Sequence, residues 1–372
     1  MNRSQRARRK ARRLNARRKR RRRSLPENWF SFERVFSFEN LMDASRRCQR
    51  NCLWKQSAAE FCRRRAVNCT QLRASLADGT FHPMPPIRFT LVERGKLRKI
   101  SGPRFRDRVV QRCIMDAFLT RLVVPTLTHG NSASVEGRGT SYAKRLAARD
   151  MVSMLNRYGP EVAVARWDVS NYFGSVPSGR ASTYLVDLVS RYTASRREED
   201  EAWRIMQLAS LYIESEPHLT LGNPLNQLAA VAYLSPLDHA LQEVDRLGPS
   251  SRFMDDGLIA CPDARSARRA LSRVGRALRR YGLKPNPKGM RTSSPVASPV
   301  TFLKTRYRYG SRYGKLGVER SRATLARLER HIAGIADAVA AGTLDIDVLD
   351  SVLRATAGLR TETSTAYPQV PA

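Results

Sequence analysis

The stretch SSRFMDDGLIA, residues 250–260, places two adjacent carboxylates, Asp255 and Asp256, between two short apolar runs. This pattern predicts two short strands that are joined by a turn at the acid pair. Adjacent acids repel each other, and acids at the ends of buried strands are costly unless a cation or another partner compensates them. Taken alone, such a pair is most often a solvated turn, so a second observation is needed to give it a function.

The second observation is the stretch EVAVARWDVS, residues 161–170, which is the strongest strand candidate of the chain and has Asp168 near its end. If this strand neighbours the Asp255–Asp256 hairpin in a sheet, three carboxylates come together. Without cations, that crowding raises at least one pKa. Mg²⁺ prefers carboxylate oxygens, and two such ions about 3.5–4 Å apart stabilise both oxygens in phosphoryl transfer. The sequence therefore predicts a site for two Mg²⁺ ions.

The overall charge indicates a polyanionic partner. Lys and Arg number 67 against 33 Asp and Glu, which gives a net charge of +34. Such an excess repels itself in a compact protein unless a polyanion neutralises it, so we expect nucleic acid first and an acidic membrane surface second. Residues 1–24 contain 14 Arg or Lys and no acid. We expect them to be a disordered arm that either binds phosphates in a salt-dependent way or is a solvated tail that binds any polyanion.

Two further features concern the compartment. No apolar run approaches the ~18 residues that span a bilayer, and the basic start lacks the apolar segment of a signal peptide. We therefore expect a soluble, cytoplasmic protein without a membrane partner. The six cysteines do not follow the spacing of a common zinc module, which predicts free and mostly buried thiols.

Hydrophobic periodicity predicts a mixture of helices and strands. Without a regular alternation of strand and helix, this order predicts an α+β fold. Strands are expected at 87–93, 97–101 and 161–170, around the acid pair, and within 301–310. Helices are expected within 30–78 and at 105–124, 139–159, 178–195, 198–213, 226–244, 264–282, 321–341 and 346–357.

At this point the residues resemble a known family. RWDVSNYFGSV (166–176) and RFMDDGLIA (252–260) resemble the first and third palm motifs of reverse transcriptases. Other segments are similar, in the same order, to motifs of bacterial retroelement reverse transcriptases, and the form of the motif between the acidic ones is typical of diversity-generating retroelements. These segments are KLRKISGPRFRDRVVQ (96–111), NSASVEGRGTSYA (131–143), TLGNPLNQLAAVAYLSPLDHAL (220–241), YGLKPNPKG (281–289) and TFLKTRYRYG (301–310).

The resemblance implies a right-hand polymerase with fingers, an antiparallel-sheet palm and a small helical thumb. It implies four regions, namely the arm (1–24), an N-terminal helical extension (25–80), the fingers and palm (81–310), and the thumb with the C-terminal tail (311–372). The implied reaction is RNA-directed DNA synthesis from dNTPs on an RNA template, starting at a DNA or RNA primer, with Mg²⁺ as cofactor. A structured noncoding RNA or an accessory protein is left open as a further partner.

The resemblance also implies roles for individual residues. Asp168 and Asp255 hold both metal ions, Asp256 is the more peripheral acid, and the Val169 carbonyl is a further ligand. Lys96 and Arg98 bind the triphosphate, because guanidinium and ammonium groups suit phosphate oxygens. Phe173 lies under the sugar and excludes a 2′-hydroxyl, unless it belongs to the core and Tyr172 is the exposed ring. Asn223 and Gln227 face the nascent base pair, with Gln227 the better candidate, and Lys288 is either a proton donor to pyrophosphate or a surface lysine.

Alternatives from other classes remain at this stage. A defence-type reverse transcriptase, from a retron or an abortive-infection system with an antiviral role, shares the same motifs. A non-catalytic RNA-binding protein that retains the polymerase fold and a plain basic RNA chaperone are also possible, and a group II intron protein ranks lower. The segment HLT at 218–220, where the family has Gly-Leu-Pro, and the residues Asn171 and Gly174 depart from the family pattern. These departures put template handling and the subfamily in doubt.

Overall fold

The computed structural model describes residues 29–50, 52–93, 96–194, 199–310, 315–320, 322–349 and 352–353. The chain forms two compact units, each of which is described by itself below. The first unit combines residues 1–128 with Asn171–Pro236, and the second combines His129–Ser170 with the chain from Leu237 onward. The arm predicted over residues 1–24 lies outside the described residues, and the four predicted regions stay a prediction.

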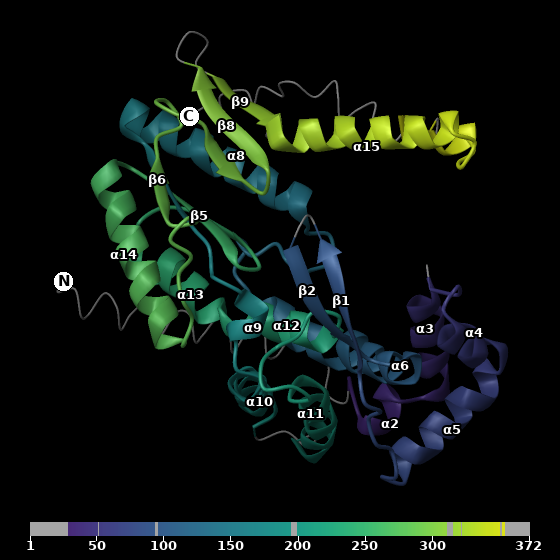
Figure 1. Cartoon of the computed structure of the whole chain (residues 1–372). Coiled ribbons are helices and arrows are strands. Elements are labelled where there is room, and N and C mark those ends of the chain that lie inside the picture. Colours follow the sequence, from purple (N-terminus) through teal and green to yellow (C-terminus); the bar gives the residue numbers. More distant parts are fainter. Residues whose placement is uncertain are drawn as a thin grey trace. The chain divides into compact units, whose positions relative to one another are not determined.

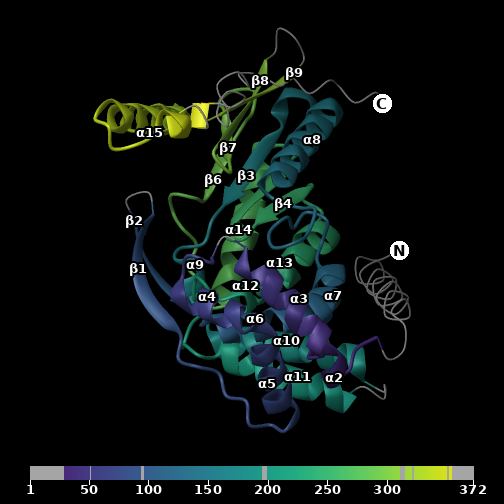
Figure 2. The ribbon, with the colours of Figure 1, turned by 90° about the vertical axis from the view of Figure 1, so that its right-hand side faces the viewer.

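The first unit is mainly helical and carries one β-hairpin (Figure 2). In the hairpin, β1 (Ile87–Glu93) pairs antiparallel with β2 (Lys96–Gly102), as the alternation predicts. Helices α6, α7, α10 and α11 pack around α12, and most residues of α12 are buried. The helices are α2 (Phe32–Val35), α3 (Phe38–Gln49), α4 (Gln56–Arg63), α5 (Arg65–Ala77), α6 (Phe105–Ile114), α7 (Thr120–Val123), α9 (Tyr172–Ser175), α10 (Ser178–Thr193), α11 (Glu199–Ile213) and α12 (Pro224–Tyr233).

The second unit contains the acid-bearing strands. Its four-stranded antiparallel sheet has the order β4-β5-β3-β6, formed by Ser250–Phe253, Asp256–Cys261, Ala163–Trp167 and Arg291–Ser293 respectively. Strand β3 pairs with β5, and Trp167 lies opposite Gly257. The prediction that the Asp168 strand neighbours the Asp255–Asp256 hairpin is therefore confirmed.

Both faces of this sheet are covered. Val164, Leu258 and Ala260 join a core with α8 (Thr140–Tyr158) and with the strands near Phe302 and Tyr307. The alternating residues Ala163, Ala165 and Ile259 are equally buried, and α14 (Ala264–Arg280) packs against β3, β5 and β6. Figure 1 shows α14 beside β5 and β6. Burial on both faces explains why β5 reads as an apolar run instead of an alternating one.

A second antiparallel sheet of this unit has the order β7-β8-β9, formed by Val300–Phe302, Thr305–Gly310 and Lys315–Arg320. The long helix α15 (Arg322–Ala340) follows it, close to the predicted 321–341. A helix starting at 346 is also present as predicted, although residues 350–351 and those from 354 onward lie outside the described part.

The prediction of one continuous helix over 226–244 is wrong, because the structure has three successive helical segments there. Helix α12 ends at Tyr233, α13 (Ser235–His239) follows, and a π-helical segment covers Ala240–Asp245. Pro236 explains the break, because proline has no backbone N–H to continue the preceding helix and clashes with the turn before it. By contrast, the predicted helix over 105–124 is continuous through α6, a π turn (Met115–Leu119) and α7.

Within the described residues, no helix combines the length and the apolar character needed to cross a bilayer. All six cysteines are free, and all except Cys62 are buried. Burial raises the pKa of Cys48 to about 11 and that of Cys261 to about 12, which makes both thiols poor nucleophiles at neutral pH.

Gly257 provides a test of the β3–β5 register. A Cβ atom at this position would lie 2.1 Å from Cε2 of the buried Trp167 ring. We expect Gly257→Ala to lower the free energy of unfolding by at least about 1–3 kcal/mol, because the indole cannot move without disturbing the sheet. The measurement is urea unfolding followed by tryptophan fluorescence.

The matched control is Gly179→Ala in α10, where nothing lies within 4 Å of the added atom. It should be neutral or stabilising by up to about 1 kcal/mol, since alanine is the better helix former. Equal unfolding midpoints for the two variants would contradict the Trp167–Gly257 packing.

Candidate active centre

The acid pair lies at a two-residue turn. Phe253 at the end of β4 pairs with Asp256 at the start of β5, so the turn consists of Met254 and Asp255. Met254 has a φ of 55°, a left-handed conformation that is unfavourable for a long side chain. Such strain persists only where surrounding contacts impose it, and it is concentrated at functional sites.

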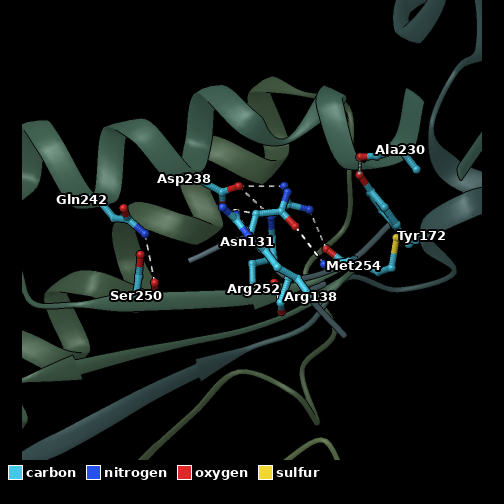
Figure 3. Close-up of polar contacts among 11 residues, drawn as sticks. Asn131, Arg138, Tyr172, Ala230, Asp238, Gln242, Ser250, Arg252 and Met254 are labelled. Carbon is cyan, nitrogen blue, oxygen red and sulfur yellow. Dashed lines mark hydrogen bonds and ion pairs between the residues drawn. The ribbon is translucent and has the colours of Figure 1, made fainter. Parts of the chain in front are cut away.

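The contacts that impose this turn come from Arg252, which is 2% exposed (Figure 3). Its Nη1 donates to the Met254 carbonyl at 2.9 Å. Its Nε and Nη2 donate to both carboxylate oxygens of the buried Asp238, at 2.7–2.9 Å. A buried charge is tolerated only when it is paired and hydrogen-bonded, so Asp238 keeps Arg252 in the position from which it holds the turn.

A neighbouring segment supports the same strand through its backbone. The Arg252 N–H donates to the Gly130 carbonyl at 2.9 Å, and the Ser132 N–H donates to the Arg252 carbonyl at 3.1 Å. A Cβ atom on Gly130 would lie 2.2 Å from the Ser250 carbonyl oxygen, so only glycine fits there. Arg138 then donates to the carbonyl of Asn131 at 3.0 Å. The segment 131–143 thus acts as a support for the hairpin.

Asp168 follows β3 directly. Extending the β3–β5 register by one residue beyond the Trp167–Gly257 pair places Asp168 opposite Asp256. The Asn286 side chain donates to Asp168 Oδ2 at 2.6 Å, and the Asn286 backbone N–H donates to the Asp168 carbonyl at 2.9 Å. A Cβ atom on Gly289 would lie 2.3 Å from Asp168 Cβ. The turn at 286–289 therefore fixes the position of this carboxylate.

Val169 is buried and forms an antiparallel bridge with Pro285. The bonds around this bridge run from the Ser170 N–H to the Lys284 carbonyl and from the Asn286 N–H to the Asp168 carbonyl. Because backbone groups alternate along a strand, the Val169 carbonyl is directed away from Pro285, toward the β5 side. This direction suits its predicted role as a ligand beside the acid pair.

Among the three acids, Asp256 has a pKa that is clearly shifted. Burial raises its pKa to about 6; Arg166 opposes the rise, while the negative charges of Asp168 and Asp255 add to it. Its Oδ1 lies 3.3 Å from Arg166 Nε. The three carboxylates therefore interact electrostatically, and Asp256 pairs with Arg166.

The fit to Mg²⁺ depends on the donor chemistry. Among the residues that the structure describes, no group of three or more His, Cys, Asp or Glu side chains is arranged to hold a metal ion. Asn286 engages one oxygen of Asp168, and Arg166 engages Asp256. Carboxylates of Asp168 and Asp255 with the Val169 carbonyl are nevertheless the hard oxygen donors that Mg²⁺ prefers. The two-ion site stays a prediction.

The remaining predicted residues divide between the units. Lys288 belongs to the second unit, is exposed, and lies in the turn that binds Asp168. Lys96, Arg98, Phe173 and Gln227 belong to the first unit. Lys96 and Arg98 lie on β2, where Arg98 is exposed and the Lys96 side chain is outside the described part.

The two aromatic residues of α9 have different environments. Tyr172 is 3% exposed, and its hydroxyl donates to the Ala230 carbonyl at 2.6 Å (Figure 3). Phe173 is half-buried. Tyr172 therefore belongs to the core, and the alternative in which Phe173 is the core ring and Tyr172 the exposed one is wrong. Asn171 adopts a φ of 46°, and a Cβ atom on Gly174 would lie 2.5 Å from its amide nitrogen, so glycine at 174 leaves room for the Asn171 side chain.

Asn223 and Gln227 also have different environments. Asn223 caps α12, accepting from the Leu225 and Asn226 N–H groups, and donates to the Tyr212 carbonyl at 2.9 Å. It is buried, so its expected contact with a base pair is replaced by a capping role. Gln227 is exposed within an otherwise buried stretch of α12. Gln227 therefore remains the candidate for an outward-facing function.

Sequence analysis did not identify Asn286, Gly289, Arg252, Asp238 or Arg166. Asn286 and Gly289 lie within the quoted segment 281–289, but nothing in that segment indicates that they lie against Asp168, which precedes Asn286 by 118 positions. The basic residue before Phe253 was a possible signal, because an arginine inside a strand next to a buried hairpin requires an acidic partner.

Comparisons with known proteins add little. No protein-family model matches the sequence, and no curated protein matches it. Similar solved structures include telomerase from Candida albicans in complex with a TWJ fragment of telomeric RNA, with a TM-score of 0.46 and 13% identity over 65% of this chain and 46% of that chain. Apo telomerase from Candida tropicalis, truncated from the C-terminal domain, gives a TM-score of 0.43 and 10% identity over 60% and 53%. The chain spans about half the length of these chains.

The buried ion pair gives a direct test of the hairpin. We expect Arg252→Met to lower the free energy of unfolding by about 3–5 kcal/mol, because it leaves the Asp238 carboxylate buried without a partner. The double variant Arg252→Met with Asp238→Leu should recover most of this loss. Urea unfolding of both variants measures the difference. If the single variant is as stable as the double variant, the Arg252–Asp238 ion pair does not stabilise the hairpin.

Proposed function

We propose that the protein is an RNA-directed DNA polymerase, a reverse transcriptase of a prokaryotic retroelement, with right-hand polymerase architecture. The observation that carries this proposal is the juxtaposition of Asp168 with the Asp255–Asp256 turn on adjacent antiparallel strands. The in-order resemblance of the remaining segments supports it. The β4-β5-β3-β6 sheet is then the palm, the β1–β2 hairpin belongs to the fingers, and α15 belongs to the thumb.

The second unit supplies the groups that hold metal. Asp168, Asp255 and the Val169 carbonyl would bind two Mg²⁺ ions, which supply charge stabilisation to the attacking and leaving oxygens when bound. Arg252 keeps Asp255 in place through the turn carbonyl, and Asn286 orients Asp168. Arg166 balances the charge of Asp256, which suits a peripheral acid. Lys288 is proposed to donate a proton to the leaving pyrophosphate.

The first unit supplies nucleotide contacts in this proposal. Lys96 and Arg98 bind the triphosphate of the dNTP, and the half-buried ring of Phe173 lies under its sugar. Gln227, the exposed side chain of α12, contacts the template or the nascent pair. The RNA template and the primer follow from the family resemblance, and the net charge of +34 suits such a polyanion.

Within this class, we propose the diversity-generating type on the form of the 220–241 segment, with the defence type as the alternative. Flanking DNA distinguishes them, since a template repeat with a variable repeat accompanies the first and a structured noncoding RNA accompanies a retron.

A non-catalytic RNA-binding protein is the second candidate from another class. The observation that favours it is that Asn286 and Arg166 already engage two of the three carboxylates. If the fold serves only as a scaffold, these contacts would be its permanent stabilisation and would not orient metal ligands.

Primer extension on an RNA template decides between the two candidates. We expect Asp255→Asn to reduce dNTP incorporation by at least about 10³-fold, because it removes several kcal/mol of stabilisation by bound metal. Asp256→Asn should cause a smaller loss. Calorimetric titration with Mg²⁺ provides a readout without turnover and should show weaker binding for Asp255→Asn.

The matched control is Asp345→Asn, an exposed acid of the second unit, which should behave as wild type in both assays. Undiminished synthesis by Asp255→Asn would overturn the catalytic assignment and favour the scaffold.

Sugar selection is tested separately at α9. Phe173→Val should admit rNTPs and raise the ratio of ribonucleotide to deoxyribonucleotide incorporation at least about tenfold, because the smaller side chain leaves room for the 2′-hydroxyl. The control Tyr172→Phe removes only the hydroxyl that donates to the Ala230 carbonyl and should leave this ratio unchanged. An unchanged ratio in Phe173→Val would assign that ring to packing.

A further inference from the structure

Helix α14 (Ala264–Arg280) has an unusually one-sided charge. Its sequence, ARSARRALSRVGRALRR, contains seven arginines and no acid. At 100° per residue the seven arginines fall within an arc of about 140°, opposite the buried Ala267, Ala270, Val274 and Leu278. All are exposed except Arg273, which is half-buried. We call this surface, formed by Arg265, Arg268, Arg269, Arg273, Arg276, Arg279 and Arg280, the arginine face.

The arginine face is largely without neutralising acids. Within the described part of the chain, only Arg273 forms an ion pair, with Asp245 at 2.9 Å. Arg269 and Arg276 donate to the hydroxyls of Ser266 and Ser272. Like charges three and four residues apart destabilise a helix by about 0.2–0.5 kcal/mol per pair. The face therefore costs stability when nothing is bound and favours the binding of a polyanion.

A hollow beside this face suits an unstacked base. It has a volume of about 260 Å³ and lies between α14 and the segment from Leu237 to Asp245. Arg276, Arg280 and Tyr281 contribute to its wall together with the paired Arg273 and Asp245, while Leu237, Ala240 and Ala277 supply apolar surface. Unpaired RNA bases are recognised by stacking on aromatic rings and guanidinium planes.

We propose that the arginine face of α14 binds a single-stranded segment of RNA, with its phosphates along the helix and an unstacked base in the hollow at Tyr281. From Arg265 to Arg280 the helix rises about 22 Å, which accommodates several consecutive phosphates. The site does not include the acidic centre, so it would hold RNA while synthesis takes place elsewhere. The inference rests on the proposed function only for its choice of RNA over single-stranded DNA.

The test is RNA binding by the full chain, measured by fluorescence anisotropy with a 20-nucleotide oligouridine over a series of salt concentrations. The variant replaces Arg265, Arg269, Arg276 and Arg280 by Gln. We expect its Kd to rise at least tenfold at 0.15 M salt. The slope of log K against log salt should fall by about 3, because each lost contact to a single strand contributes about 0.7.

The matched control replaces four exposed arginines by Gln. They lie in α4, in α5, in α10 and at the position that joins α4 to α5. These are Arg63, Arg64, Arg73 and Arg191, and their replacement removes the same charge. It should change the Kd less than threefold. Equal losses in the two quadruple variants would overturn the proposal, because they would show an effect of net charge alone.

Two further arms define the ligand. Tyr281→Leu should weaken RNA binding several-fold without changing the salt slope, since it removes stacking and no charge. Oligodeoxythymidine and poly-glutamate of the same length should bind α14 more weakly than RNA does, and equal loss of all three ligands in the arginine variant would overturn the choice of RNA.

Performing the binding assay with Asp255→Asn as well separates this inference from the proposed function. That variant should keep wild-type RNA affinity while it loses synthesis. If synthesis is unaffected but the arginine variant still loses RNA, the polymerase proposal fails and the RNA site stands.

Discussion

The buried ion pair between Arg252 and Asp238 is the constraint on which the candidate centre depends. The pair neutralises the buried arginine of β4 through its Nε and Nη2 groups, while Nη1 donates to the Met254 carbonyl. That bond stabilises a left-handed residue that would otherwise be unfavourable in a tight turn. The turn that carries Asp255 is thus held by a contact from a buried side chain.

The strands and most helices could be predicted from the sequence because their signals are local. The apolar run before Asp168 and the acid pair between two short apolar runs required only periodicity to place. The break at Pro236 could have been inferred from the same rules, since proline interrupts a helix. β6, with three residues, carries too short a pattern to be recognised.

The supporting residues of the centre could not be predicted in the same way. Asn286 and Gly289 matter because the fold brings their turn against Asp168, and the sequence contains no periodicity that reports this contact. Asn223 illustrates the opposite error, because a polar residue in a resembling segment suggested substrate contact while its side chain caps α12. Burial decides between these roles, and burial of a polar side chain is a property of the folded chain.

The separations along the chain between these contacts carry a kinetic consequence. Arg252 and Asp238 are 14 residues apart, whereas Arg166 and Asp256 are 90 apart and Asp168 and Asn286 are 118 apart. Closing a long loop costs more entropy than closing a short one, so local contacts form earlier during folding. We therefore expect the β4–β5 hairpin with the Arg252–Asp238 pair to form before β3 adds to it. Because β6 pairs only with β3, the sheet is completed only when β3 arrives, and the repulsion among the three carboxylates arises at the same step.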